Sequence, residues 1–256
     1  MSKSALRVLE IMELVAARRE GCSHTAIAQE LEIPKSSLTA LLQDLQSTGY
    51  LQRNPESGVF TIGVQVLWLA NSYLRNLNLV RLGQPVVAQL FARVQEFSLL
   101  AIPSGSDYVI ICTESMPSIL AHSLQVGQRG PLHSSGVGRA MMAYMPPTQV
   151  DNIIDESMSS TAALSAKPNA AEIKRELQKT RRRGIGYSNE SNIAGVIGIA
   201  APVFNASGSP VGALGVGIPS TRAKNIDSAP VEDALRELSQ QLSTQLGWRL
   251  EMAGNH

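Results

Sequence analysis

Hydroxyl, amide and basic side chains cluster in the first 55 residues of this 256-residue chain. Between Pro34 and Gly49 they alternate with leucines spaced three or four apart, so a helix here would bury its leucines and expose its polar side. Exposed groups of this kind hydrogen-bond phosphates and base edges in DNA grooves. Helix starts also expose such residues for capping alone, and that alternative stays open. The candidates for DNA contact are Ser23, Thr25, Lys35, Ser36, Ser37, Thr39, Gln43 and Arg53.

Residue types that catalyse reactions or bind metals do not form a working arrangement. His133, Ser134 and Ser135 lack the G-x-S-x-G elbow and an evident acid partner, so capping and core packing are the simpler interpretation. His122, His133 and Cys112 lack the spacing of metal ligands. We therefore expect no catalytic residue, no metal and no cofactor.

Composition excludes several classes of protein. The chain is 44% hydrophobic and 17% charged, as in ordinary soluble proteins. No apolar stretch approaches the roughly 20 residues that span a bilayer, and residues 1–7 lack the apolar region of a signal peptide. Two cysteines are too few for a disulfide framework. These features predict a cytoplasmic protein without a membrane partner.

Bulk charge gives no support for DNA binding. The net charge is +1, and residues 1–60 hold six basic and seven acidic side chains, a net charge of −1. A basic face can coexist with an acidic one on a small domain. DNA binding must therefore be argued from pattern and local placement.

Three short helices and a hairpin are expected to position the N-terminal polar groups. Apolar spacing predicts helices over residues 5–17, 23–31 and 34–49, with Ser23 as an N-cap and Gly49 near a C-cap. Turn formers between residues 50–53 and 59–62 predict two short strands, which form a wing with Arg53 at its tip. Together they predict a winged helix-turn-helix domain over residues 1–65.

A linker helix and a mixed domain should follow. Residues 66–81 carry a wide apolar stripe that needs a partner, which a second copy of the chain in a homodimer or tetramer would supply. The pattern over residues 82–252 is α+β. Its predicted strands cover 98–102, 108–113, 119–124, 197–204 and 211–218, and its predicted helices cover 136–145, 170–183 and about 231–246.

The whole chain resembles the IclR family of bacterial transcriptional regulators. The segment from Ser23 to Gly63, with IPKSSLTALLQDLQSTGYLQRNPESGVFTIG, resembles the family's DNA-binding domain. GPLHSSGVGRAMMAYMP, RRRGIGYSNESNIAGVIGIAAPVF and GSPVGALGVGIP resemble its effector-binding domain. The resemblance implies a GAF-like sensor fold, an operator of double-stranded DNA, a dimer or tetramer, and repression or activation switched by a small organic metabolite.

The resemblance also implies an effector site with departures from the family pattern. Members that hold a small carboxylate tend to place an acid, a thiol and two hydroxyls where this chain has Ser188, Gly198, Gly215 and Gly217, so we expect a larger or more aromatic effector than a two- or three-carbon acid. Ala40 likewise replaces a frequent arginine of the recognition helix, and Ala26 a frequent glutamate. The glycines could instead serve close packing alone. The implied effector residues are Ile119, His122, Ser135, Gly136, Val137, Ser188, Glu190, Gly198, Gly215 and Gly217.

Two other functions remain open from the sequence. One is an enzyme built on the α/β domain with an accessory helical domain, although no nucleophile, base and orienting group can be named for it. The other is a winged helix that binds protein instead of DNA, which the slightly acidic N-terminal part would allow.

Overall fold

The computed structural model describes residues 3–76, 78–116, 124–159, 169–223 and 227–249. Contacts divide the chain into two compact units, residues 1–77 and 78–256. Each unit is described by itself below.

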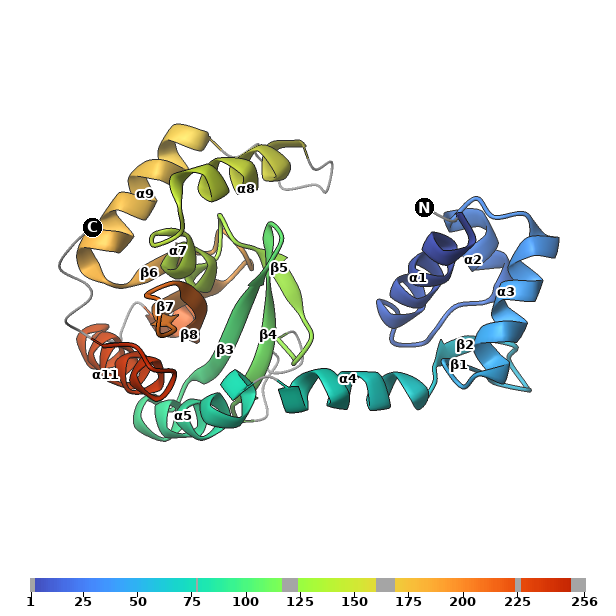
Figure 1. The fold of residues 1–256 in the computed structure, drawn as a ribbon, viewed down its shortest axis with the longest axis horizontal. Coiled ribbons are helices and arrows are strands. Elements are labelled where there is room, and N and C mark those ends of the chain that lie inside the picture. Colours follow the sequence, from blue (N-terminus) through green and yellow to red (C-terminus); the bar gives the residue numbers. More distant parts are fainter. Residues whose placement is uncertain (1–2, 77, 117–123, 160–168, 224–226, 250–256) are drawn as a thin grey trace. The chain divides into compact units, whose positions relative to one another are not determined.

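The first unit is a helix-turn-helix with a two-stranded wing (Figure 1). Ile11, Ile27, Leu38 and Leu42 are at most 2% exposed and form its core. The elements are α1 (Lys3–Ala16), α2 (His24–Glu30), α3 (Lys35–Ser47), β1 (Leu51–Arg53), β2 (Phe60–Ile62) and α4 (Gln65–Asn76).

Local sequence signals set the ends of these helices. The Ser23 hydroxyl accepts a hydrogen bond from the Ala26 N–H at 3.2 Å and caps α2. Pro34 precedes α3, and Gly49 follows it with φ of 77°, a left-handed conformation that favours glycine. The predicted N-cap and the predicted glycine stop are therefore confirmed.

Helical residues lie on both sides of Leu77, which is outside the described residues. α4 reaches Asn76 and α5 (Asn78–Val94) starts at Asn78, the first residue of the second unit.

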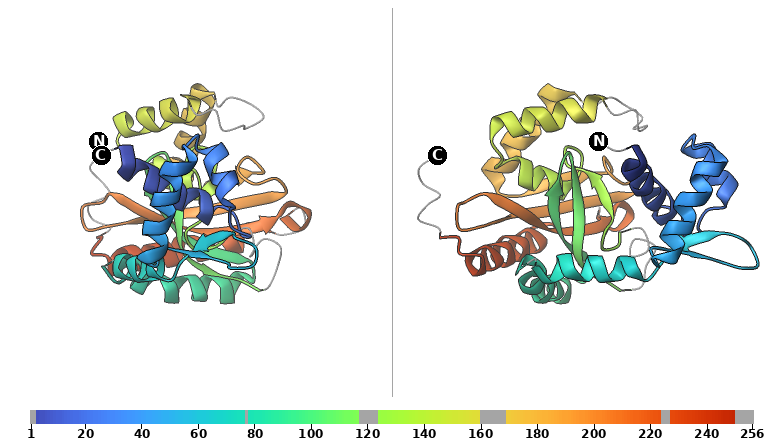
Figure 2. Two further views of the ribbon diagram at one scale, coloured as in Figure 1. Left: turned by 90° about the vertical axis from the view of Figure 1, so that its right-hand side faces the viewer. Right: turned by 45° about the vertical axis from the view of Figure 1, so that its right-hand side comes forward.

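The second unit is built on a six-stranded antiparallel sheet of order β5-β4-β3-β8-β7-β6. α5 and α11 cover one face of the sheet, and α7 with α8 and α9 covers the other (Figure 2). Its other elements are β3 (Phe97–Ser104), β4 (Asp107–Glu114), β5 (Arg129–Pro131), α7 (Gly136–Met142), α8 (Pro147–Ser159), α9 (Ala170–Arg183), β6 (Gly186–Asn189), β7 (Val196–Phe204), β8 (Pro210–Pro219), α10 (Ser220–Ala223) and α11 (Ala229–Gln245).

Several elements of this unit escaped the sequence analysis. The sequence analysis predicts no helix between residues 145 and 170, but α8 lies there and begins at Pro147, a position that suits proline. β5 and β6 have three and four residues and little apolar alternation, so they gave no strand signal. The predicted strand over 119–124 falls, except for Leu124, outside the described residues. In the described ranges, no helix is long and apolar enough to cross a membrane.

Candidate functional site

The outer face of α3 is polar, as its leucine spacing predicts. Leu38, Leu42 and Leu45 are buried. Ser36, Ala40, Gln43 and Ser47 recur three or four residues apart and are all exposed, so they share the opposite side of the helix. The other predicted DNA contacts, Ser23, Thr25, Lys35, Ser37, Thr39 and Arg53, are exposed as well.

His24, which the sequence analysis did not single out, is bonded to one of these candidates. Its Nε2 lies 3.0 Å from the Thr39 hydroxyl, which donates its proton to the Lys35 carbonyl at 2.8 Å. A hydroxyl has one proton, so His24 Nε2 must be the donor in their shared bond. Because its one proton is committed to the Lys35 carbonyl, the Thr39 hydroxyl is left with acceptor capacity only.

The wing arginine is held against its own strand pair. Arg53 lies opposite Phe60 across β1 and β2, and its guanidinium sits over the phenyl ring, 5.8 Å from the centroid. Such stacking lowers the freedom of a long side chain while leaving its charge exposed.

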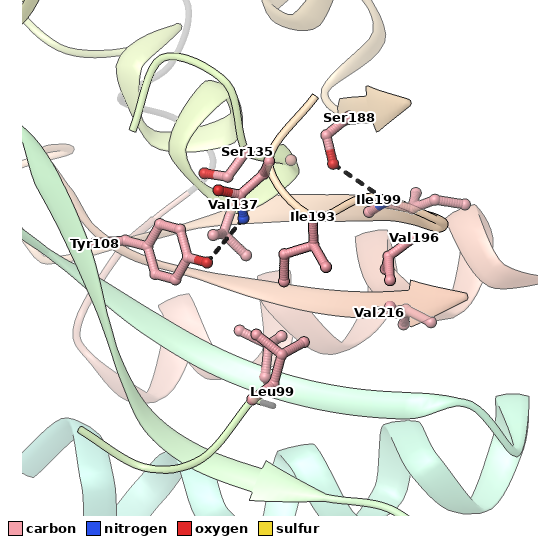
Figure 3. Close-up of a pocket in the computed structure, with 14 residues that line it drawn as sticks. Leu99, Tyr108, Ser135, Val137, Ser188, Ile193, Val196, Ile199 and Val216 are labelled. Atoms are coloured by element: carbon pink, nitrogen blue, oxygen red, sulfur yellow. Dashed lines mark hydrogen bonds between the residues drawn. The ribbon is translucent and has the colours of Figure 1, made fainter. Parts of the chain in front are cut away.

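A cavity lies in the second unit, between the start of α7, the sheet and the segment that joins β6 to β7 (Figure 3). Apolar side chains with a few polar groups line it, a combination typical of small-molecule sites. Its lining residues are Leu99, Tyr108, Leu124, Ser135, Gly136, Val137, Ser188, Asn192, Ile193, Val196, Gly198, Ile199, Val216 and Gly217.

Most of the implied effector residues meet at this cavity. Ser135, Gly136, Val137, Ser188, Gly198 and Gly217 line it. Two others stand apart. The Glu190 carboxylate accepts a hydrogen bond from the Gly195 N–H at 3.1 Å. Gly215 packs against Val137, because a Cβ added at Gly215 would lie 2.7 Å from Val137 Cγ1. Ile119 and His122 lie outside the described residues.

The glycines beside the cavity serve close packing. A Cβ at Gly136 would lie 2.9 Å from the Gly198 carbonyl oxygen, and one at Gly186 would lie 2.6 Å from the Ala140 nitrogen. These glycines therefore let α7 sit directly on the sheet. A Cβ at Gly198 would lie 2.6 Å from the Ser188 oxygen, so glycine at this position leaves the space that the Ser188 hydroxyl occupies.

Two polar residues of the cavity were missed by the sequence analysis. Tyr108 on β4 is 3% exposed, and its oxygen accepts a hydrogen bond from the Asn192 amide at 3.0 Å. Burial raises the pKa of Tyr108, which keeps the phenol protonated. The two residues are 84 positions apart, so only the folded sheet brings them together.

The remaining polar groups of α7 are structural. Ser135 caps the helix by accepting from the Gly138 N–H at 3.0 Å. Burial and the nearby Arg139 lower the pKa of His133, which favours its neutral form. Arg139 donates to the carbonyls of His133 and Tyr187 at 3.1 and 2.6 Å. The described residues contain no cluster of side chains that could hold a metal ion.

A helix-turn-helix unit joined to a cavity-bearing α/β unit defines a class of one-chain transcription regulators. The family model for the IclR helix-turn-helix domain matches residues 4–55, and that for the bacterial transcriptional regulator IclR C-terminal domain matches residues 71–244. The chain belongs to the IclR family of bacterial transcriptional regulators. It is a DNA-binding regulator with a C-terminal effector-binding domain, and not an enzyme.

Individual relatives agree with this assignment. The chain is 27% identical over 219 residues to the probable transcriptional regulator SauR of Cupriavidus necator, covering 86% of this chain and 87% of that protein. It is 25% identical over 222 residues to the transcriptional repressor IclR of Escherichia coli, covering 86% and 81%. An IclR homologue of Microbacterium hydrocarbonoxydans, solved in complex with 4-hydroxybenzoate, has the same fold, with a TM-score of 0.76, 21% identity and coverage of 95% and 99%.

Proposed function

We propose that this regulator binds operator DNA through the exposed side of α3 and that a small metabolite in the cavity beside α7 controls its DNA affinity. The single observation that carries the proposal is the largely apolar cavity beside α7, in the domain that accompanies the helix-turn-helix. Coupling between two sites is reciprocal, so the effector must change DNA affinity by the factor by which DNA changes effector affinity.

We also propose that the effector is larger than a two- or three-carbon acid. The cavity is lined mainly by apolar side chains. A tiny acid would leave its polar groups unpaired there, whereas an aromatic body would pack against this lining. The related regulator solved with 4-hydroxybenzoate makes a benzene ring a reasonable size for the first probes.

The assembly and organisation are part of the same proposal. Leu67 and Trp68 on α4 are 61% and 60% exposed, and an exposed apolar patch is typical of an interface. A second copy, in a homodimer or tetramer, would cover it and present two recognition helices to successive half-sites. We propose residues 1–65 as the DNA-binding domain, 66–81 as the linker, 82–252 as the effector domain, and the cytoplasm as the location.

A mobility-shift titration with the DNA upstream of the protein's own coding region tests the DNA part. We expect binding that falls steeply with salt, because phosphate contacts release counterions. Calorimetry with glyoxylate, pyruvate and a set of aromatic catabolites tests the effector part. Micromolar binding of glyoxylate or pyruvate would overturn the proposed effector size, and failure to bind any duplex at low salt would overturn the DNA part.

A further inference from the structure

The described part of the effector cavity has an uncharged lining. None of the 14 lining residues in the described part of the chain carries an ionisable acid or base other than the Tyr108 phenol. The cation of α7, Arg139, is not among them, because its guanidinium is turned to the carbonyls of His133 and Tyr187. Burying a carboxylate without an opposite charge is costly, so this lining disfavours an acid.

Three hydroxyl groups line the cavity, those of Tyr108, Ser135 and Ser188. Figure 3 shows the Tyr108 hydroxyl and the Ser188 hydroxyl on opposite sides of Ile193. Each of the three oxygens already accepts one hydrogen bond, from Asn192 at 3.0 Å, from the Gly138 N–H at 3.0 Å and from the Gly198 N–H at 3.2 Å. The hydroxyls of Tyr108 and Ser188 therefore do not converge on one point, as donors that stabilise an anion would.

Tyr108 and Asn192 together form a polar pair at one end of an apolar space. The bond between them uses one amide hydrogen of Asn192 and leaves the phenol proton for a second bond. Gly130 lies opposite Tyr108 across β4 and β5, and a Cβ there would lie 2.6 Å from the phenol oxygen. The absence of a side chain at Gly130 therefore leaves the space that the Tyr108 phenol occupies.

The segment from Glu190 to Gly195 holds Asn192 and Ile193 against the cavity. The Ser191 hydroxyl donates to the Ser134 carbonyl at 2.7 Å, and Glu190 accepts from the Gly195 N–H at 3.1 Å. Because the segment is closed on itself and bonded to the residues before α7, the amide of Asn192 is presented to the phenol in a fixed position.

We infer that the effector of this regulator is an uncharged, largely apolar molecule whose carbonyl or hydroxyl oxygen accepts a hydrogen bond from the Tyr108 hydroxyl, with Asn192 as the second polar contact. The inference rests on the proposed function, because it concerns the ligand of the same cavity. Tyr108 and Asn192 are then specificity-determining residues that orient the oxygen of the ligand, and the uncharged described lining disfavours a carboxylate.

Matched pairs of compounds test this inference with the full-length protein. The probes are 4-hydroxybenzamide against 4-hydroxybenzoate and benzamide against benzoate, measured by calorimetry at pH 8, where both acids are ionised. We expect each amide to bind at least about tenfold more tightly than its acid, because the lining provides no charge for a carboxylate.

Variants then assign the preference to the polar pair. Tyr108→Phe keeps the ring and removes the hydroxyl, and it should weaken amide binding about fivefold. Gly130→Ala, which displaces the phenol without removing it, should have a similar effect. Tyr144→Phe removes a phenol that lies outside this cavity, and it should change neither affinity.

The outcomes separate the inference from the proposed function. Acids that bind as tightly as their amides would overturn the inference and leave the cavity as an effector site. Equal loss of amide binding in Tyr108→Phe and Tyr144→Phe would also overturn it. If none of the four compounds binds the wild-type protein, both the inference and the use of this cavity for aromatic effectors are overturned.

Discussion

The packing of α7 against the backbone of Leu132, the residue that follows β5, gives the most quantitative prediction. A Cβ added at Gly138 would lie 2.0 Å from the Leu132 carbonyl oxygen and 2.4 Å from its Cα. Both atoms belong to the backbone, and Leu132 is fully buried, so no side-chain rotation relieves the collision. Overpacking of this kind costs about 3 kcal/mol, the upper end of the usual range. We therefore expect Gly138→Ala to destabilise the second unit and to displace the helix start that lines the cavity.

Gly105→Ala is the matched control. Gly105 has φ of 63° and no atom within 4 Å of its added Cβ, so its cost is only the left-handed backbone strain of about 1 kcal/mol. Urea unfolding followed by circular dichroism measures both variants. With a slope of about 2 kcal/mol per molar urea, the midpoint for this unit should fall by about 1.5 M in Gly138→Ala and about 0.5 M in Gly105→Ala. Equal midpoints would refute the packing of α7 described above.

Three further predictions concern single side chains. Lys35→Ala should weaken DNA binding to all sequences alike and reduce the salt slope by about one, and an unchanged slope in mobility-shift titrations would remove Lys35 from the interface. His24→Ala removes the hydrogen bond to the Thr39 hydroxyl and should lower operator affinity about fivefold. His24→Gln, whose side-chain amide also donates, should partly restore the affinity. Equal operator affinity in the wild type, His24→Ala and His24→Gln would show that this hydrogen bond has no role. Burial raises the pKa of Cys112 to about 11, so the native thiol should resist iodoacetamide at pH 8 and react only after unfolding; rapid labelling of the native protein would contradict this burial.

Periodic and capping signals predicted most of the fold. The leucine spacing of α3, the Ser23 N-cap and the C-cap glycine Gly184, with φ of 70°, are local signals. Each depends only on neighbouring residues in the chain, so each is visible in the sequence. β5 and α8 were missed because Arg129–Pro131 and Pro147 are poor signals by themselves. Those elements depend on pairing with β4 and packing against α9.

The candidate site likewise contains residues that the sequence predicted and residues that only the folded structure reveals. Positions such as Ser188 and Gly198 could be inferred from the family resemblance, and they line the cavity. Tyr108 and Asn192 could not be, because an aromatic residue in a strand and an asparagine in a turn are ordinary in those places. Only the register of β4 with β5 and the bonding of the segment after β6 bring them together.

The outward side of α3 is the central element of this account, and one charge placed on it gives the most direct test. Gln43→Glu adds a negative charge to the exposed face, whereas Gln241→Glu adds the same charge to an exposed site on α11. In mobility shifts with the upstream DNA, Gln43→Glu should weaken binding at least about tenfold through repulsion by phosphates, and Gln241→Glu should bind like the wild type. Wild-type affinity in Gln43→Glu would contradict the placement of α3 in a DNA groove.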